Sequence, residues 1–246
     1  MSGTGAEVDT APLYAVLSGD IVGSSRFMDS GPTVRDAITS AYRACAEAFE
    51  DALGGLPKVD VFAGDSWQML VRSPAAALSV ALCMRALIRS NEQLPEADTR
   101  IAIGIGTVEF IEQDRLSQSQ GEAFTLSGEA LDGLPDRGPQ IAVALPERWR
   151  RHTDEQLLDP QETLDTMMVL LDWICGDWSA ASANAIAGAL RGLTQTQIAE
   201  VTGVSQPAVS KSLNGGGWVQ VKRVVDWWEA FLSPEWRDHR RPNITA

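Results

Sequence analysis

The stretch TQTQIAEVTGVSQPAVSKSL, residues 194–213, determines the local fold near the C-terminal end of the chain. Thr194 can cap a helix over residues 195–200, and Gly203 supplies a sharp turn with a left-handed backbone. Ser205 caps a second helix, and a proline is tolerated in the first turn of that helix. The apolar positions expected to pack the two helices together are Ile198, Ala199, Val204, Val209 and Leu213.

The same stretch closely resembles the helix-turn-helix of bacterial transcription factors, including the frequent GVSQxxVS segment. The resemblance implies a module that reads DNA, with an amphipathic helix over residues 219–232 covering its back. Gln and Ser side chains can hydrogen-bond base edges, and a Lys suits a phosphate. A helix pair used only for protein packing stays open as an alternative. The positions expected to face DNA are Gln206, Ala208, Ser210, Lys211 and Asn214.

The charge of the chain is unevenly distributed. The 246 residues carry a net charge of −13, which argues against a protein that binds nucleic acid indiscriminately. Residues 185–246 carry +2 and the remainder carries −15. Because the basic part is weakly charged, one copy of the module should bind DNA poorly, and we expect a homodimer on paired half-sites.

Composition also restricts the location of the protein and the chemistry open to it. No run approaches 18 apolar residues, so we expect no membrane span. Residues 1–12 lack the pattern of a signal peptide and are expected to form a disordered tail. The three cysteines lie far apart among apolar residues, as buried free thiols of a reducing cytoplasm do. With only two histidines, the chain has no His-rich metal site.

The first part of the chain alternates between strand and helix patterns. Its order is strand, helix, hairpin, helix, strand, helix, strand, which indicates an α+β fold of the ferredoxin-like type. A connecting helix over residues 160–178, rich in Leu, Met and Trp, follows. The expected strands are 13–17, 59–63, 66–71, 100–110 with a hairpin partner at 111–116, and 140–144, and the expected helices are 32–53, 74–89 and 121–131.

Two aspartates end neighbouring elements of this expected sheet. Asp20 follows the first strand in GDIVGSS, and Asp65 lies in the hairpin turn of FAGDS. Two carboxylates held close together repel each other unless a cation lies between them, and Mg²⁺ suits carboxylate, phosphate and water oxygens. The turn at Gly23, Ser24 and Ser25 offers backbone N–H groups and hydroxyls to a phosphate.

Residues 13–144 resemble the catalytic domain of class III nucleotidyl cyclases through GDIVGSS, FAGDSWQML, RIAIGIG and GEAFTLSGEAL. With TQxxIAxxxGVSQPAVSKxL added, nearly the whole chain resembles the bacterial SatD-like family. The resemblance implies Mg²⁺ or Mn²⁺ on Asp20, Asp65 and the Ile21 carbonyl, with a nucleoside triphosphate or another nucleotide as ligand. The implied organisation is a disordered tail over 1–12, a cyclase-like domain over 13–151, a linker helix over 152–184 and a helix-turn-helix domain over 185–246.

Four positions depart from the cyclase pattern. Where cyclases have an Asn and an Arg on the third helix, this chain has Thr125 and Glu129. The purine-reading Lys and its Asp partner are matched by Val61 and Gln118. Loss of a preorganised cation costs a phosphoryl-transfer site several kcal/mol of barrier. Arg26, which we expect to bind the nucleotide together with residues 23–25, or a residue from a second subunit could replace that cation.

Three functions follow from these patterns. The first is a cytoplasmic regulator in which the cyclase-like domain binds a metal–nucleotide and biases the DNA-binding module. The second is a divergent nucleotidyl cyclase with the helix-turn-helix as tether or control element. The third is a pseudo-enzyme dimer without a ligand. The retained aspartates favour the first two, and the departures favour the first over the second.

Overall fold

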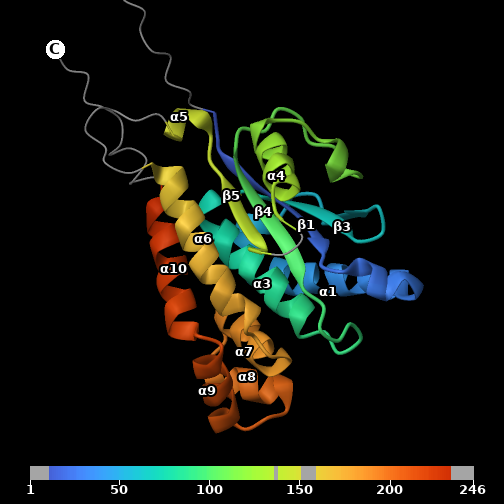
Figure 1. The fold of residues 1–246 in the computed structure, drawn as a ribbon, viewed down its shortest axis with the longest axis vertical. Coiled ribbons are helices and arrows are strands. Elements are labelled where there is room, and N and C mark those ends of the chain that lie inside the picture. Colours follow the sequence, from blue (N-terminus) through green and yellow to red (C-terminus); the bar gives the residue numbers. More distant parts are fainter. Residues whose placement is uncertain (1–10, 136–137, 151–158, 234–246) are drawn as a thin grey trace, which may run out of the picture.

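The structure is a computed structural model that describes residues 11–135, 138–150 and 159–233 (Figure 1). The order of its first elements matches the expected one. Four short elements lie between them, and a fifth, α5, follows the last strand: η1 (Ser24–Ser30), α2 (Glu50–Leu53), η2 (Pro74–Ala76), η3 (Leu116–Gln118) and α5 (Glu147–Arg150). The main elements are β1 (Tyr14–Ile21), α1 (Gly31–Ala48), β2 (Asp60–Phe62), β3 (Ser66–Val71), α3 (Ala77–Arg89), β4 (Thr99–Gly106), α4 (Glu122–Asp132) and β5 (Ile141–Ala144).

The strands form one five-stranded mixed sheet in the order β2-β3-β1-β4-β5. The central strand β1 pairs antiparallel with both β3 and β4, and β5 runs parallel to β4. Asp20 lies opposite Arg100 in the β1–β4 register, and Gly19 lies opposite Trp67 in the β1–β3 register. The α+β class expected from the sequence is therefore confirmed.

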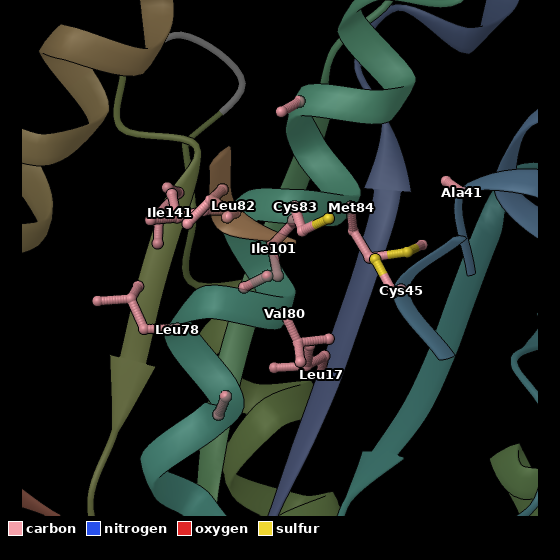
Figure 2. Close-up of a cluster of buried hydrophobic side chains, with 14 of the residues drawn as sticks. Leu17, Ala41, Cys45, Leu78, Val80, Leu82, Cys83, Met84, Ile101 and Ile141 are labelled. Atoms are coloured by element: carbon pink, nitrogen blue, oxygen red, sulfur yellow. The ribbon is translucent and has the colours of Figure 1, made fainter. Parts of the chain in front are cut away.

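Helices cover both faces of the sheet. Because side chains alternate between the two faces along each strand, both faces carry apolar residues that a helix can bury. Leu17 of β1 belongs to the larger apolar core, where it lies with residues of α3 such as Val80 (Figure 2). Val16, the preceding residue, belongs to a separate cluster under α4 that includes Leu70 and Phe124. The sheet is thus enclosed between α1 and α3 on one side and α4 on the other.

Glycine in β4 allows α4 to lie very close to the sheet. A Cβ atom added at Gly104 would collide with the backbone of α4 at Ala123 and Ser127. Ser127 is fully buried, and its hydroxyl lies 2.9 Å from that of Ser18 on β1. The close approach therefore positions a polar contact between α4 and the central strand.

Five further helices complete the described fold: α6 (Pro160–Gly176), α7 (Ala180–Leu190), α8 (Gln195–Thr202), α9 (Gln206–Gly215) and α10 (Trp218–Phe231). In Figure 1, α6 and α10 run side by side, while α8 and α9 lie together at the lower end of the molecule. α7 packs against α3 as well as α8 and α9. One continuous apolar core therefore extends from the sheet to the last helix.

α7 is the element that the sequence patterns did not identify. Its residues are small and apolar, and most of them are buried, so it shows no polar face with helical spacing. It crosses the expected boundary between residues 184 and 185. The division into domains stays a prediction, and both its 151/152 boundary and most of the 1–12 tail lie outside the described residues.

Three local expectations are wrong. The expected strand over 100–110 ends at Gly106, and its expected hairpin partner at 111–116 forms no strand. The chain leaves the sheet there, and Phe110 instead forms an isolated bridge with Gln120, which also lies outside the sheet. The expected helix over 32–53 is interrupted at Phe49, whose backbone is not helical. Val204 does not pack between the two short helices, since it lies in the turn and is 49% exposed.

Among the residues that the structure describes, none forms a helix both long and apolar enough to cross a membrane.

Candidate functional site

An open cavity of about 420 Å³ lies where β1 ends beside the β2–β3 turn. The backbone after β1 turns sharply at Gly23, whose φ of +63° is in the left-handed region that favours glycine. Val22 N donates to the carbonyl of Asp98 at 2.9 Å, which fixes the start of this turn. The cavity is lined by Asp20, Ile21, Val22, Gly23, Ser24, Ser25, Asp65 and Arg100.

The structure brings together six of the seven residues proposed for the metal and the phosphate. Asp20 and Ile21 come from β1, Asp65 from the hairpin turn, and residues 23–25 from the loop between them. Arg26 is the exception. It is exposed, and its guanidinium lies 5.5 Å from the centre of the Phe27 ring rather than in the cavity lining.

Asp20 already has a cationic partner. Arg100 Nε donates to one carboxylate oxygen at 2.9 Å, and Nη2 donates to the other at 2.6 Å. This two-bond geometry is the strong form of an Arg–carboxylate pair. The side chains are only 17% and 24% exposed, so water screens the pair less than it screens a surface ion pair.

The backbone around Asp20 is held by a buried chain of hydrogen bonds. Trp67 Nε1 donates to Thr99 Oγ1 at 3.1 Å, and Thr99 Oγ1 donates to the Asp20 carbonyl at 2.7 Å. Gly19 makes room for this arrangement, because a Cβ there would lie 2.5 Å from the Trp67 ring. The position of the Asp20 carboxylate is therefore set by β3 and β4 as well as by its own strand.

The oxygen atoms that Asp20, Asp65 and the Ile21 carbonyl contribute are of the type that binds a divalent cation. Two carboxylates and a backbone carbonyl are the oxygen ligands that Mg²⁺ and Mn²⁺ take. Asp65 is half-buried, and among the described residues it has no ion-pair partner. Each Asp20 oxygen already accepts a hydrogen bond from Arg100, so a metal at Asp20 would share the carboxylate with the guanidinium or displace it.

A buried ionic cluster lies directly behind the cavity loop. Arg85 of α3 is 1% exposed and donates twice to Asp98 at 2.8 Å and once to Asp172 of α6 at 2.5 Å. Arg89 adds a 2.6 Å bond to Asp98. Burial alone would raise the pKa of Asp98, but the hydrogen bonds and charges of Arg85 and Arg89 outweigh it and lower that pKa.

The α8–α9 helix pair is the second candidate surface. Thr194 Oγ1 accepts from Gln197 N at 3.3 Å while the Gln197 side chain accepts from Thr194 N at 2.9 Å, so both hydrogen bonds of the capping box at the start of α8 are formed. Gly203 ends α8 with a φ of +70°. Ser205 Oγ then accepts from Ala208 N at 3.4 Å at the start of α9. The expected caps and turn are confirmed.

The outer side of α9 carries the residues proposed to face DNA. Gln206, Ala208, Lys211 and Asn214 are exposed, and Ser210 is half-buried. Gln206 Nε2 donates to Gln195 Oε1 of α8 at 2.5 Å, so the two helix starts are linked by a hydrogen bond. The inner side of α9 is apolar, with Val209 and Leu213 almost fully buried.

Sequence reasoning missed Arg100, Arg85 and Asp98. Arg100 starts the apolar strand motif RIAIGIG, and its charge one residue inside a buried strand was the available signal. Arg85 lies among apolar residues of α3, where an unpaired charge would be costly, so its presence implied a buried partner. Neither partner was identifiable without the fold.

Comparison of the chain with protein-family models, with curated proteins and with solved structures found no match. The assignment of function therefore rests on the two surfaces described above.

Proposed function

We propose that this protein is a cytoplasmic regulator in which α8 and α9 form a DNA-binding helix-turn-helix and the sheet domain binds a metal–nucleotide ligand. The observation that carries the proposal is the exposed polar face of α9, presented by a short helix pair that is capped at every expected position. Class III cyclase-like and SatD-like sequence patterns support the same assignment.

The chemistry of α9 supports DNA as the partner. Gln206 lies in its first turn, where a side chain of a helix in the major groove reaches base edges. Lys211 lies about 1.4 turns further along α9 and suits a phosphate.

The cavity supports the ligand half of the proposal. We assign the sheet to the ferredoxin-like type, because β1 to β4 have the order β2-β3-β1-β4 with antiparallel neighbours. Asp20, Asp65 and the Ile21 carbonyl would hold Mg²⁺ or Mn²⁺, which would neutralise the charge of a nucleotide phosphate. Residues 23–25 would bind that phosphate through backbone N–H groups and hydroxyls.

A homodimer completes the proposal, because a weakly basic module gains affinity by contacting two half-sites. The outward side of α6 is the surface that supports it. Val169, Leu170 and Trp173 are 51%, 63% and 72% exposed. The opposite side of the same helix is used within the chain, where Leu164, Met168, Leu171 and Cys175 are buried.

A divergent nucleotidyl cyclase is the second candidate, and the shared cavity of Asp20 and Asp65 favours it. The four departures from the cyclase pattern weigh against it. Thr125 and Glu129 are exposed on α4 and outside the cavity lining, and Val61 is buried. Incubation with each nucleoside triphosphate and Mg²⁺ or Mn²⁺, followed by mass spectrometry, distinguishes a regulator from a cyclase by the presence of a cyclic product.

The main proposal is tested by measuring the binding of the full-length protein to genomic DNA fragments. Fluorescence anisotropy at two salt concentrations gives the affinity. We expect binding that weakens steeply with salt and favours some fragments over others. No binding at low salt, with or without nucleotide, would reject the DNA-binding assignment and leave the helix pair as a packing element.

A further inference from the structure

The ion pair between Asp20 and Arg100 decides what the cavity can bind. Both carboxylate oxygens of Asp20 accept hydrogen bonds from one guanidinium, at 2.9 Å and 2.6 Å. Both residues line the cavity, and both are mostly buried. A cation that enters the cavity therefore meets an Asp20 whose charge is already neutralised.

A divalent cation and the guanidinium compete for the same two oxygens. To bind Asp20, the cation must coordinate an oxygen that already accepts an N–H bond from Arg100. It would then lie within a few ångströms of the positive charge of Arg100, and like charges at that separation repel strongly in a partly buried site. Free cations are for this reason disfavoured at Asp20.

Arg100 has a second attachment that keeps it in the cavity wall when it leaves Asp20. Its Nη1 donates to the Leu134 carbonyl at 3.2 Å, independently of the carboxylate. Ser24 and Ser25 line the same cavity. A phosphate beside these residues would offer Arg100 the same bidentate acceptor geometry that Asp20 offers now.

We infer that Arg100 makes the cavity selective for a metal-bound polyphosphate over a free cation. Arg100 blocks Asp20 when a cation arrives alone, and it transfers its hydrogen bonds to the phosphate when cation and polyphosphate arrive together. Metal and polyphosphate then bind cooperatively, since each removes the obstacle to the other. This inference rests on the proposed metal–nucleotide site and names the residue that sets its ligand specificity.

The test compares Mn²⁺ binding by the full-length wild type and by Arg100→Gln, using the electron paramagnetic resonance signal of free Mn²⁺. Each protein is titrated with and without inorganic triphosphate. We expect Arg100→Gln to bind Mn²⁺ alone on the order of tenfold more tightly than the wild type, as the loss of a competing cation requires. We also expect triphosphate to enhance Mn²⁺ binding in the wild type and to lose most of that effect in the variant.

Three further variants make the result specific. Arg148→Gln removes an arginine that pairs with Glu122 outside the cavity, and it should bind Mn²⁺ like the wild type. Asp20→Asn in the Arg100→Gln background should abolish the gain. Arg100→Lys keeps the positive charge but loses the planar guanidinium that binds both carboxylate oxygens. It replaces Arg100→Gln in the test if that variant does not fold, and we expect from it a smaller gain in Mn²⁺ affinity.

The outcomes separate this inference from the function on which it rests. Cooperative Mn²⁺–triphosphate binding by the wild type, with no gain of Mn²⁺ affinity in either Arg100 variant, overturns the role of Arg100 alone. Absence of Mn²⁺ binding in the wild type and in both variants, with and without triphosphate, overturns the metal–nucleotide site as well.

Discussion

Trp178 donates from its indole Nε1 to the backbone carbonyl of Gly216, 2.8 Å away and buried. The bond joins the start of α7 to the end of α9. The carbonyl of the same Trp178 accepts from Arg89 at 2.8 Å, and Arg89 also binds Asp98, whose own carbonyl accepts from Val22 in the cavity loop. A continuous series of polar contacts therefore connects the cavity with the end of the proposed recognition helix.

The Trp178 bond should contribute measurably to stability. Trp178→Phe leaves the Gly216 carbonyl buried without its donor, and we expect a loss of about 1–3 kcal/mol in the free energy of unfolding. Trp227→Phe is the matched control, because Trp227 is 36% exposed on α10, outside the apolar patch of α6, and should change stability by less than about 0.5 kcal/mol. Urea unfolding followed by circular dichroism measures both. Equal effects of the two substitutions would contradict the structural role of Trp178.

Two glycines associated with α4 should respond oppositely to the same substitution. Gly104→Ala drives a Cβ into the backbone of α4 and should destabilise the protein by about 1–3 kcal/mol through overpacking. Gly128→Ala adds a Cβ with no atom within 4 Å in the middle of α4, and it should stabilise by about 0.5–1 kcal/mol through helix propensity. Thermal unfolding of both variants tests the close packing of α4. A neutral Gly104→Ala would show that α4 lies further from the sheet.

The sequence predicted most elements of this fold because their signals are local. Caps such as Thr194 and Ser205, turn glycines such as Gly203, and alternating apolar residues act within a few positions of the chain. α7 was missed because a helix buried on nearly all sides has no polar face to reveal its period. In the site, the shared cavity of Asp20 and Asp65 followed from strand adjacency, whereas the partner of Asp20 depended on the exact register between β1 and β4.

Asp98 should make stability sensitive to acid. Its pKa in the folded protein lies below the ordinary value of 3.8, so its contribution is present above that value and is lost as the pH falls through the lower folded pKa. Asp98→Asn removes the charged partner of the buried Arg85 and should lower the free energy of unfolding by about 3–5 kcal/mol at neutral pH. The variant should also lose less stability than the wild type as the pH falls below 4.

The control for this prediction is Asp226→Asn. Asp226 pairs with Lys222 on α10, but both side chains are more than half exposed, so the pair should contribute little. Urea unfolding at a series of pH values between neutral and strongly acidic conditions measures both variants. An acid dependence in Asp98→Asn identical to that of the wild type would contradict the role of Asp98.

The outward side of α6 should hold the proposed dimer together. Trp173→Asp places a charge at the centre of the exposed apolar patch with Val169 and Leu170, which would be buried between two copies. We expect the wild type to be a dimer at micromolar concentration and the variant to be a folded monomer in light scattering. Val219→Asp is the control, because Val219 is 70% exposed on α10 and is not part of the α6 patch. A monomeric wild type would reject the dimer.

The two polar residues of α9 should affect DNA binding in different ways. Lys211→Ala removes a phosphate contact and should weaken binding to all sequences alike, with the slope of log affinity against log salt reduced by about 1. Lys222→Ala is the charge-matched control. It removes the same charge from α10, where Lys222 is paired with Asp226 at 2.7 Å, and should leave the slope unchanged. Equal effects of both substitutions would mean that net charge, and not the face of α9, determines binding.

Gln206→Ala should act on sequence preference and not on general affinity. A side chain that contacts one base edge contributes about 1–3 kcal/mol of discrimination at that base pair, and its loss flattens the preference there alone. Gln206 is suited to this role because Gln195 holds its amide group at the exposed start of α9, which reduces the freedom lost on binding. Gln195→Ala should for that reason reduce discrimination at the same base pair by less than Gln206→Ala does. Fluorescence anisotropy on a panel of single-base variants of the best fragment measures the preferences, and discrimination lost evenly across all positions would contradict a direct base contact by Gln206.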